Sequence, residues 1–234
     1  MNYIFERMDR GFDASLISKE LEIELNKEMS KRMATVRDEI KAKNCLICGK
    51  KVNSFCRSHY IPKYCLDNIA SEGKVLGPNS IIDLPSMGQS YGKKEIGVGE
   101  AGTFSLICRE CDKLMFEQYE NPDNYSNSKT PTQRMLLEIT TKNYLKFIYK
   151  RKSEIALYEG LLDTLKNSRK TSDIRDLQMY EIEQKLNISR LDLESYMCDF
   201  NSEKNIYMMN RKRFITFSIT SCLIMWHLLP FKTL

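Results

Sequence analysis

Two pairs of cysteines are the residues of this chain whose types and spacing most clearly indicate chemistry. The first pair is Cys45 and Cys48, and the second is Cys108 and Cys111. Two cysteines separated by two residues can both point inward from one tight turn, and two such turns supply the four thiolates of a tetrahedral structural Zn²⁺ site. Because both pairs have the same spacing, we interpret them as one zinc site and not as unrelated buried thiols.

A third pair leaves a rival site open. Cys56 and His59 are also separated by two residues. Zn²⁺ would then be bound by Cys45, Cys48, Cys56 and His59, a Cys₃His set, and the second cysteine pair would have another role. Cys65 belongs to neither set, and we expect it to be structural.

Cysteine usage and charge also predict a compartment and a class of partner. The N-terminus, MNYIFERMDRGFD, has no apolar segment of the kind found in secretory signals. Paired cysteines in a chain that is not exported are metal ligands more often than disulfides, so we expect a reducing cytoplasm. The net charge of +5 is compatible with a nucleic-acid partner without requiring one.

Long helices are predicted on both sides of the cysteines. Residues 1–44 contain an amphipathic helix whose apolar positions recur at spacings of four and three from Ile17 to Ile40. This stripe would pack on its own domain or on a second copy, in a helix-mediated homodimer. After a polar, turn-rich linker at 123–130, residues 131–210 are predicted to form a helical hairpin.

The region between these helices has a different composition. Residues 45–122 contain short apolar runs, and residues 73–102 carry seven glycines, which predicts loops or a hairpin inserted into a compact zinc module. The expected fold class is therefore helix-rich α+β, with a small zinc-bound module between the N-terminal helix and the C-terminal hairpin.

The apolar tail, residues 211–234, is predicted to be a buried strand. Its apolar run from 214 to 231 is near the lower length limit for a membrane span. In its first half, however, apolar residues alternate with Ser and Thr, which is the period of a strand. We therefore expect no membrane partner.

Residues 45–112, under a third of the chain, resemble the zinc-flanked HNH endonucleases, which have the ββα-metal fold. The matching stretches, in order, are CLICGK, SHYIPKYCL and LICRECD. The resemblance implies that His59 is the general base and that Asp112 is a ligand of a catalytic Mg²⁺ or similar ion. It also implies that the four paired cysteines hold the structural Zn²⁺, and that the substrate is DNA.

The chain departs from the family pattern at three positions. Ser58 replaces the usual acidic neighbour of the histidine, and the central Asn position falls at Thr103 or Phe104. No second histidine lies near the second cysteine pair, because the other histidine of the chain, His227, is far away in the tail. Three glutamates are candidates to replace it: Glu110, Glu117 and Glu120.

Three functions remain open at this point. The leading hypothesis is a metal-dependent HNH-type endonuclease that hydrolyses phosphodiester bonds in DNA. The alternative is a catalytically degenerate zinc module that binds nucleic acid or protein without chemistry. A third interpretation is an assembly protein that acts through its helices. An intact set of catalytic-metal ligands would distinguish the first from the second.

Overall fold

The computed structural model describes residues 27, 31–78, 93–128, 130–167 and 173–210. Helix predominates in this part of the chain and the strands are short, so the helix-rich α+β class is confirmed. The labelled elements, in chain order, are β1 (Ser58–His59), α3 (Lys63–Ile69), β2 (Lys74–Pro78), β3 (Lys93–Gly97), β4 (Thr103–Phe104), α4 (Arg109–Met115), the 3₁₀ helix η2 (Pro122–Ser128), α5 (Gln133–Lys166) and α6 (Asp173–Asn210).

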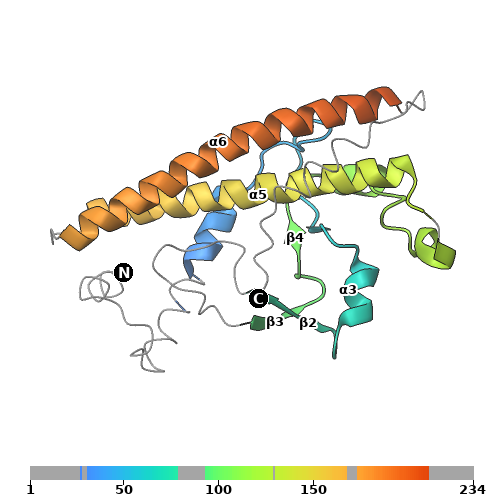
Figure 1. The fold of residues 1–234 in the computed structure, drawn as a ribbon, viewed down its shortest axis with the longest axis horizontal. Helices are drawn as coiled ribbons and strands as arrows, with labels where there is room; N and C mark the ends of the chain where they lie inside the picture. The colour runs from blue at the N-terminus through green and yellow to red at the C-terminus, as the bar shows by residue number, and fades with distance from the viewer. Residues whose placement is uncertain (1–26, 28–30, 79–92, 129, 168–172, 211–234) are drawn as a thin grey trace.

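Two long helices, α5 and α6, lie side by side and form the long axis of the molecule (Figure 1). Helix α5 begins at Gln133 because the Thr132 hydroxyl accepts a hydrogen bond from the Met135 backbone N–H at 3.1 Å, an N-terminal cap. The predicted linker before it contains η2, a turn of 3₁₀ helix. Together α5 and α6 supply the surface on which the cysteine-containing region packs.

The strands form two separate two-stranded antiparallel sheets. In the first, β1 pairs with β4, and Ser58 lies opposite Phe104. In the second, β2 pairs with β3, and Val75 lies opposite Ile96. The second sheet is a hairpin within the glycine-rich segment, one of the two outcomes that its composition predicted.

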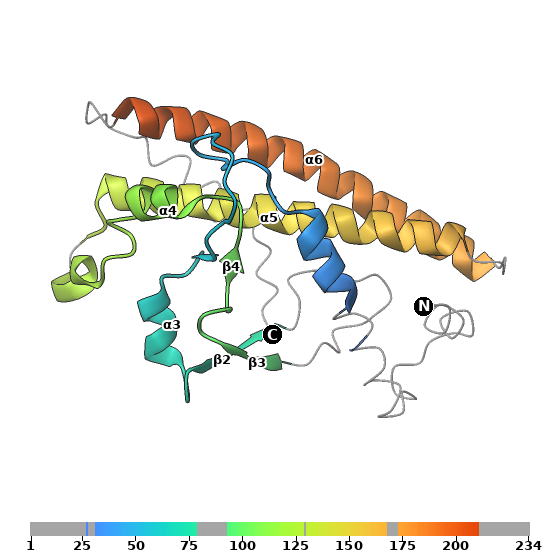
Figure 2. The same ribbon diagram turned by 180° about the vertical axis from the view of Figure 1, so that it is seen from behind.

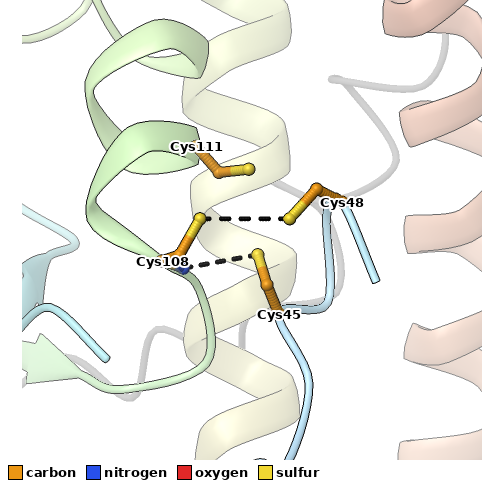
Figure 3. A group of neighbouring side chains, drawn as sticks. All are labelled: Cys45, Cys48, Cys108 and Cys111. Carbon is orange, nitrogen blue, oxygen red and sulfur yellow. Dashed lines mark hydrogen bonds between the residues drawn. The ribbon is translucent and has the colours of Figure 1, made fainter. Parts of the chain in front are cut away.

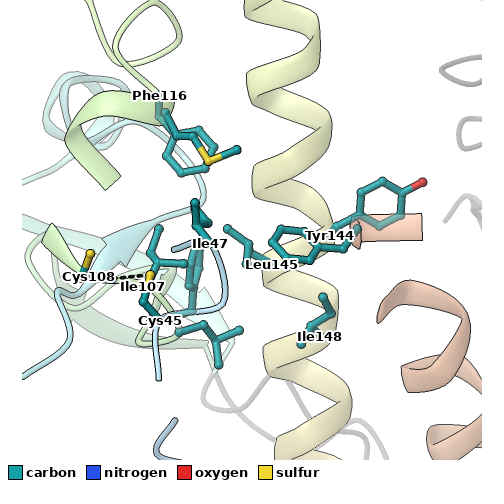
Figure 4. Packing of buried hydrophobic residues seen from close by; sticks show 12 residues of the cluster. Cys45, Ile47, Ile107, Cys108, Phe116, Tyr144, Leu145 and Ile148 are labelled. Carbon is teal, nitrogen blue, oxygen red and sulfur yellow. Dashed lines mark hydrogen bonds between the residues drawn. The ribbon is translucent and has the colours of Figure 1, made fainter. Parts of the chain in front are cut away.

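The main hydrophobic core joins the cysteine-containing region to the two long helices, α5 and α6. Ile47 and Ile107, next to the cysteine pairs, are buried together with Leu145 and Ile148 of α5 (Figure 4). From α6, the Lys204 ammonium donates a hydrogen bond to the Leu46 carbonyl at 3.1 Å. The cysteine turns therefore rest on both long helices.

A second core holds the described part of the N-terminal helix. Residues 31–39 are helical and cross α5, as the view from behind shows (Figure 2). Val36, from the predicted apolar stripe, is 1% exposed and packs with Leu157 of α5 and Ile182 of α6. This segment of the stripe is therefore buried within its own chain.

Two expectations from the sequence concern residues that the structure does not describe. The first portion of the amphipathic stripe, before residue 27, and the tail at 211–234 lie outside the described residues. Within the described ranges, no helix combines the length and the apolar character that crossing a membrane requires.

Candidate metal centre and adjoining polar cluster

The four paired cysteines come together as the spacing predicted. Their sulfur atoms all lie within 4.8 Å of one another, and the Cys48 and Cys108 sulfurs are 4.0 Å apart (Figure 3). Zinc–sulfur bonds of about 2.3 Å in a tetrahedron place the sulfur atoms about 3.8 Å apart. The group therefore fits a structural metal ion such as Zn²⁺.

Backbone hydrogen bonds shape the two turns that present these sulfurs. In the first turn the Gly49 N–H donates to the Cys45 carbonyl at 2.8 Å, and Gly49 has a φ of 71°, which glycine adopts without a steric penalty. The Cys108 N–H donates to the Cys45 sulfur at 3.3 Å. The Leu46 N–H donates to the Leu106 carbonyl at 3.1 Å, which ties the two turns together.

Cys56 and His59 make other contacts. The Cys56 thiol donates to the Ile107 carbonyl at 3.3 Å, and His59 Nε2 lies 3.0 Å from the Val98 carbonyl oxygen. Burial, followed in importance by the nearby Asp112 carboxylate, raises the pKa of Cys56 to about 12. Across the described ranges, the four paired cysteines are the group of three or more His, Cys, Asp or Glu side chains close enough to share one metal ion, so the geometry favours that set over Cys₃His.

Asp112 lies beside the strand that contains His59. His59 ends β1, and Asp112 is in the first turn of α4, directly after the second cysteine pair. Ser58, which is fully buried, donates a hydrogen bond from Oγ to Asp112 Oδ1 at 2.5 Å. Ser58 therefore links β1 to the Asp112 carboxylate, although it is one of the positions at which the sequence departs from the HNH family pattern.

One of the three candidate glutamates joins this group. Glu120 forms an ion pair with Lys142, whose Nζ also lies 3.7 Å from Asp112 Oδ1. Burial raises the pKa of the Glu120 carboxyl above its usual range, while Lys142 acts in the opposite direction. By contrast, Glu117 is 72% exposed and faces Arg134.

Lys142 is the member of the cluster that the sequence did not reveal. Its side chain is 1% exposed, and its ammonium lies 4.4 Å from the centroid of the Phe116 ring. A lysine at this position of an amphipathic helix is normally solvent-exposed, so periodicity gave no signal for it. The structure thus assembles two carboxylates, a hydroxyl and an ammonium next to the strand that carries His59.

Comparisons with known proteins leave the family open. No family model, curated protein or solved structure matches the chain. The residues of the metal centre and of the adjoining cluster are therefore the basis on which a function is assigned.

Proposed function

We propose that the cysteine-containing region is an HNH-type nuclease module that hydrolyses phosphodiester bonds in DNA. The observation that carries the proposal is the placement of Asp112, through Ser58, against the strand that holds His59. The pairing of the strands supports it, because β4 pairs with β1 and is followed by α4, as in a ββα unit, with α3, β2 and β3 inserted between the two strands. The four cysteines would hold a structural Zn²⁺ that fixes the start of α4.

His59 is the proposed general base. Because the Nε2–H donates a hydrogen bond to the Val98 carbonyl, the lone pair of the neutral ring is on Nδ1. That nitrogen would take a proton from the attacking water as the water oxygen forms a bond to phosphorus, and the bond between phosphorus and the leaving oxygen would break. The hydrogen bond to Val98 fixes both the tautomer and the ring orientation.

The nearby oxygen atoms would be the ligands of a hard divalent cation. The carboxylates of Asp112 and Glu120 and the hydroxyl of Ser58 are ligands of the kind that Mg²⁺ prefers. Such an ion, when bound, stabilises negative charge on the leaving oxygen. Glu120 takes the place that a second histidine would have in the family pattern.

Positive charge on α5 supports a nucleic-acid substrate. The Lys146 ammonium lies 4.5 Å from the centroid of the ring of Tyr60, the residue after His59. Burial lowers the pKa of Lys146, and the neighbouring charge of Lys150 adds to this effect. A phosphate beside Lys146 would supply the counter-charge that favours its protonated form.

A specific observation favours the second candidate, a zinc module that binds nucleic acid or protein without chemistry. The ammonium of Lys142 is placed among the oxygens that a catalytic ion would need. Ser58 also stands where the family has an acidic ligand. A protein with this arrangement could retain the zinc fold and Lys146 after losing the ability to hydrolyse DNA.

Nicking of supercoiled plasmid by zinc-loaded protein, in Mg²⁺ or Mn²⁺, separates the two functions. Asp112→Asn and Glu120→Gln are expected to abolish metal-stimulated nicking, because each removes a charged ligand. Glu117→Gln is the matched control, since Glu117 is exposed and faces Arg134 instead of the cluster. Equal loss in all three variants, or nicking that survives Asp112→Asn, would refute the assigned ligand set.

A further inference from the structure

The positive charge beside Asp112 and Glu120 is a side chain of the protein, the ammonium of Lys142. Lys142 reaches both carboxylates from α5, with its Nζ 3.7 Å from Asp112 Oδ1 and in an ion pair with Glu120. Its side chain is 1% exposed, whereas those of Asp112 and Glu120 are 19% and 36% exposed. The ammonium therefore lies on the protein side of the cluster, and the carboxylates are reachable from solvent.

An ammonium in this position must be paired, because a buried charge without a partner is strongly unfavourable. The same two carboxylates are the anionic ligands available to a divalent ion in the cluster. Two cations that share these oxygens repel each other, and the repulsion is strong where water is largely excluded. Binding of one therefore weakens binding of the other.

We propose that Lys142 is a tethered competitor that controls access of a divalent cation to Asp112 and Glu120. The proposal rests on the assignment of these carboxylates as ligands in the proposed function. It adds a regulatory element on α5, outside both cysteine turns. An ion that binds must displace the ammonium from at least one carboxylate, and the Phe116 ring, whose centroid is already 4.4 Å from Nζ, would continue to stabilise the ammonium.

Mn²⁺ binding to the zinc-loaded, full-length chain, followed by electron paramagnetic resonance of the free ion, tests this proposal. Lys142→Met removes the ammonium and keeps a side chain of similar length. We expect it to bind Mn²⁺ about tenfold more tightly than wild type, as for sites coupled by like charge. Adding Asp112→Asn to Lys142→Met should remove the gain. Lys150→Met is the matched control on the same helix, because Lys150 pairs with Glu154 at 3.7 Å.

A second variant protects the test against misfolding. Lys142→Gln retains an N–H donor for the carboxylates, and it should also bind Mn²⁺ more tightly than wild type. Thermal melting gives an independent readout: Mn²⁺ should raise the melting temperature of both Lys142 variants more than that of wild type. Unchanged or weaker Mn²⁺ affinity in the folded variants would overturn the proposal.

These outcomes are separate from the success of the nuclease assignment. Tighter Mn²⁺ binding by the Lys142 variants without DNA nicking by any variant would support the tethered competitor and contradict the nuclease. Nicking by wild type that depends on Asp112, with no gain in Mn²⁺ affinity on removal of Lys142, would support the nuclease and contradict the competitor.

Discussion

Ser58 in β1 donates a hydrogen bond to the carboxylate of Asp112 in α4, with 2.5 Å between Oγ and Oδ1. This contact connects the first sheet to the helix that begins at the second cysteine pair. Ser58 is fully buried, so water cannot replace it as a donor without rearrangement. The residue that departs from the family pattern thus holds the proposed ligand in position.

Ser58→Ala should destabilise the protein without releasing its metal. A hydrogen bond to a charged group contributes about 1.5–3 kcal/mol, and its loss leaves Asp112 with one donor fewer. Chemical denaturation should show a decrease of this size in the free energy of unfolding. Elemental analysis should show unchanged zinc, and loss of zinc in this variant would mean that Ser58 supports the cysteine turns directly.

Zinc content should separate the two ligand sets. Purified protein should carry about one zinc per chain, and Cys48→Ser and Cys108→Ser should each lose it and unfold the module, because metal binding contributes to folding. Cys56→Ser should retain the metal, since its thiol faces the Ile107 carbonyl. Full zinc in Cys108→Ser together with loss in Cys56→Ser would establish the Cys₃His site instead.

Cys56 should resist alkylation at pH 8. Burial and the Asp112 carboxylate raise its pKa to about 12, so the reactive thiolate is scarce at that pH and increases only as the pH approaches this value. Peptide mapping after iodoacetamide treatment should show slow labelling of Cys56 and fast labelling of the exposed Cys198. Chelation of zinc should accelerate labelling of the four paired cysteines first. Rapid labelling of Cys56 in zinc-loaded protein would contradict this environment.

Gly102→Ala should lower the melting temperature. Gly102 has a φ of 62°, and an added Cβ would lie 2.9 Å from the Tyr60 ring. The backbone conformation alone costs about 1–2 kcal/mol for a residue with a side chain, and the contact would displace the ring next to His59. Gly99→Ala is the control, because a Cβ there meets nothing within 4 Å. Equal melting temperatures for the two variants would contradict both the backbone cost at Gly102 and the contact with Tyr60.

The cysteine site was the part of the molecule most open to prediction from sequence. The spacing within each pair lets one tight turn present both thiols on the same side. The fold had only to bring the two turns together. The glycine-rich segment was likewise resolved into a hairpin, β2 and β3. Strands β1 and β4 have two residues each, too few for a periodic pattern, so the sequence did not predict them.

The polar cluster could be predicted only in part. The resemblance indicated Asp112, and it left three glutamates open for the missing histidine. The choice of Glu120 depends on the path of the chain after α4, and Lys142 depends on how α5 packs against it. Neither relationship leaves a local signal, because Lys142 has the same sequence context as a solvent-exposed helical lysine.

Plasmid nicking by zinc-loaded His59→Ala is the most direct test of the central claim that this module hydrolyses DNA with His59 as its base. Wild type should nick slowly in Mg²⁺ or Mn²⁺, since Ser58 replaces an acidic ligand and the central Asn is missing. His59→Ala should reduce the rate roughly 100-fold or more, the usual effect of losing a general base, with zinc content and melting temperature unchanged. Wild-type protein with full zinc and no nicking in either metal, or a His59→Ala variant that nicks as fast as wild type, would contradict the account.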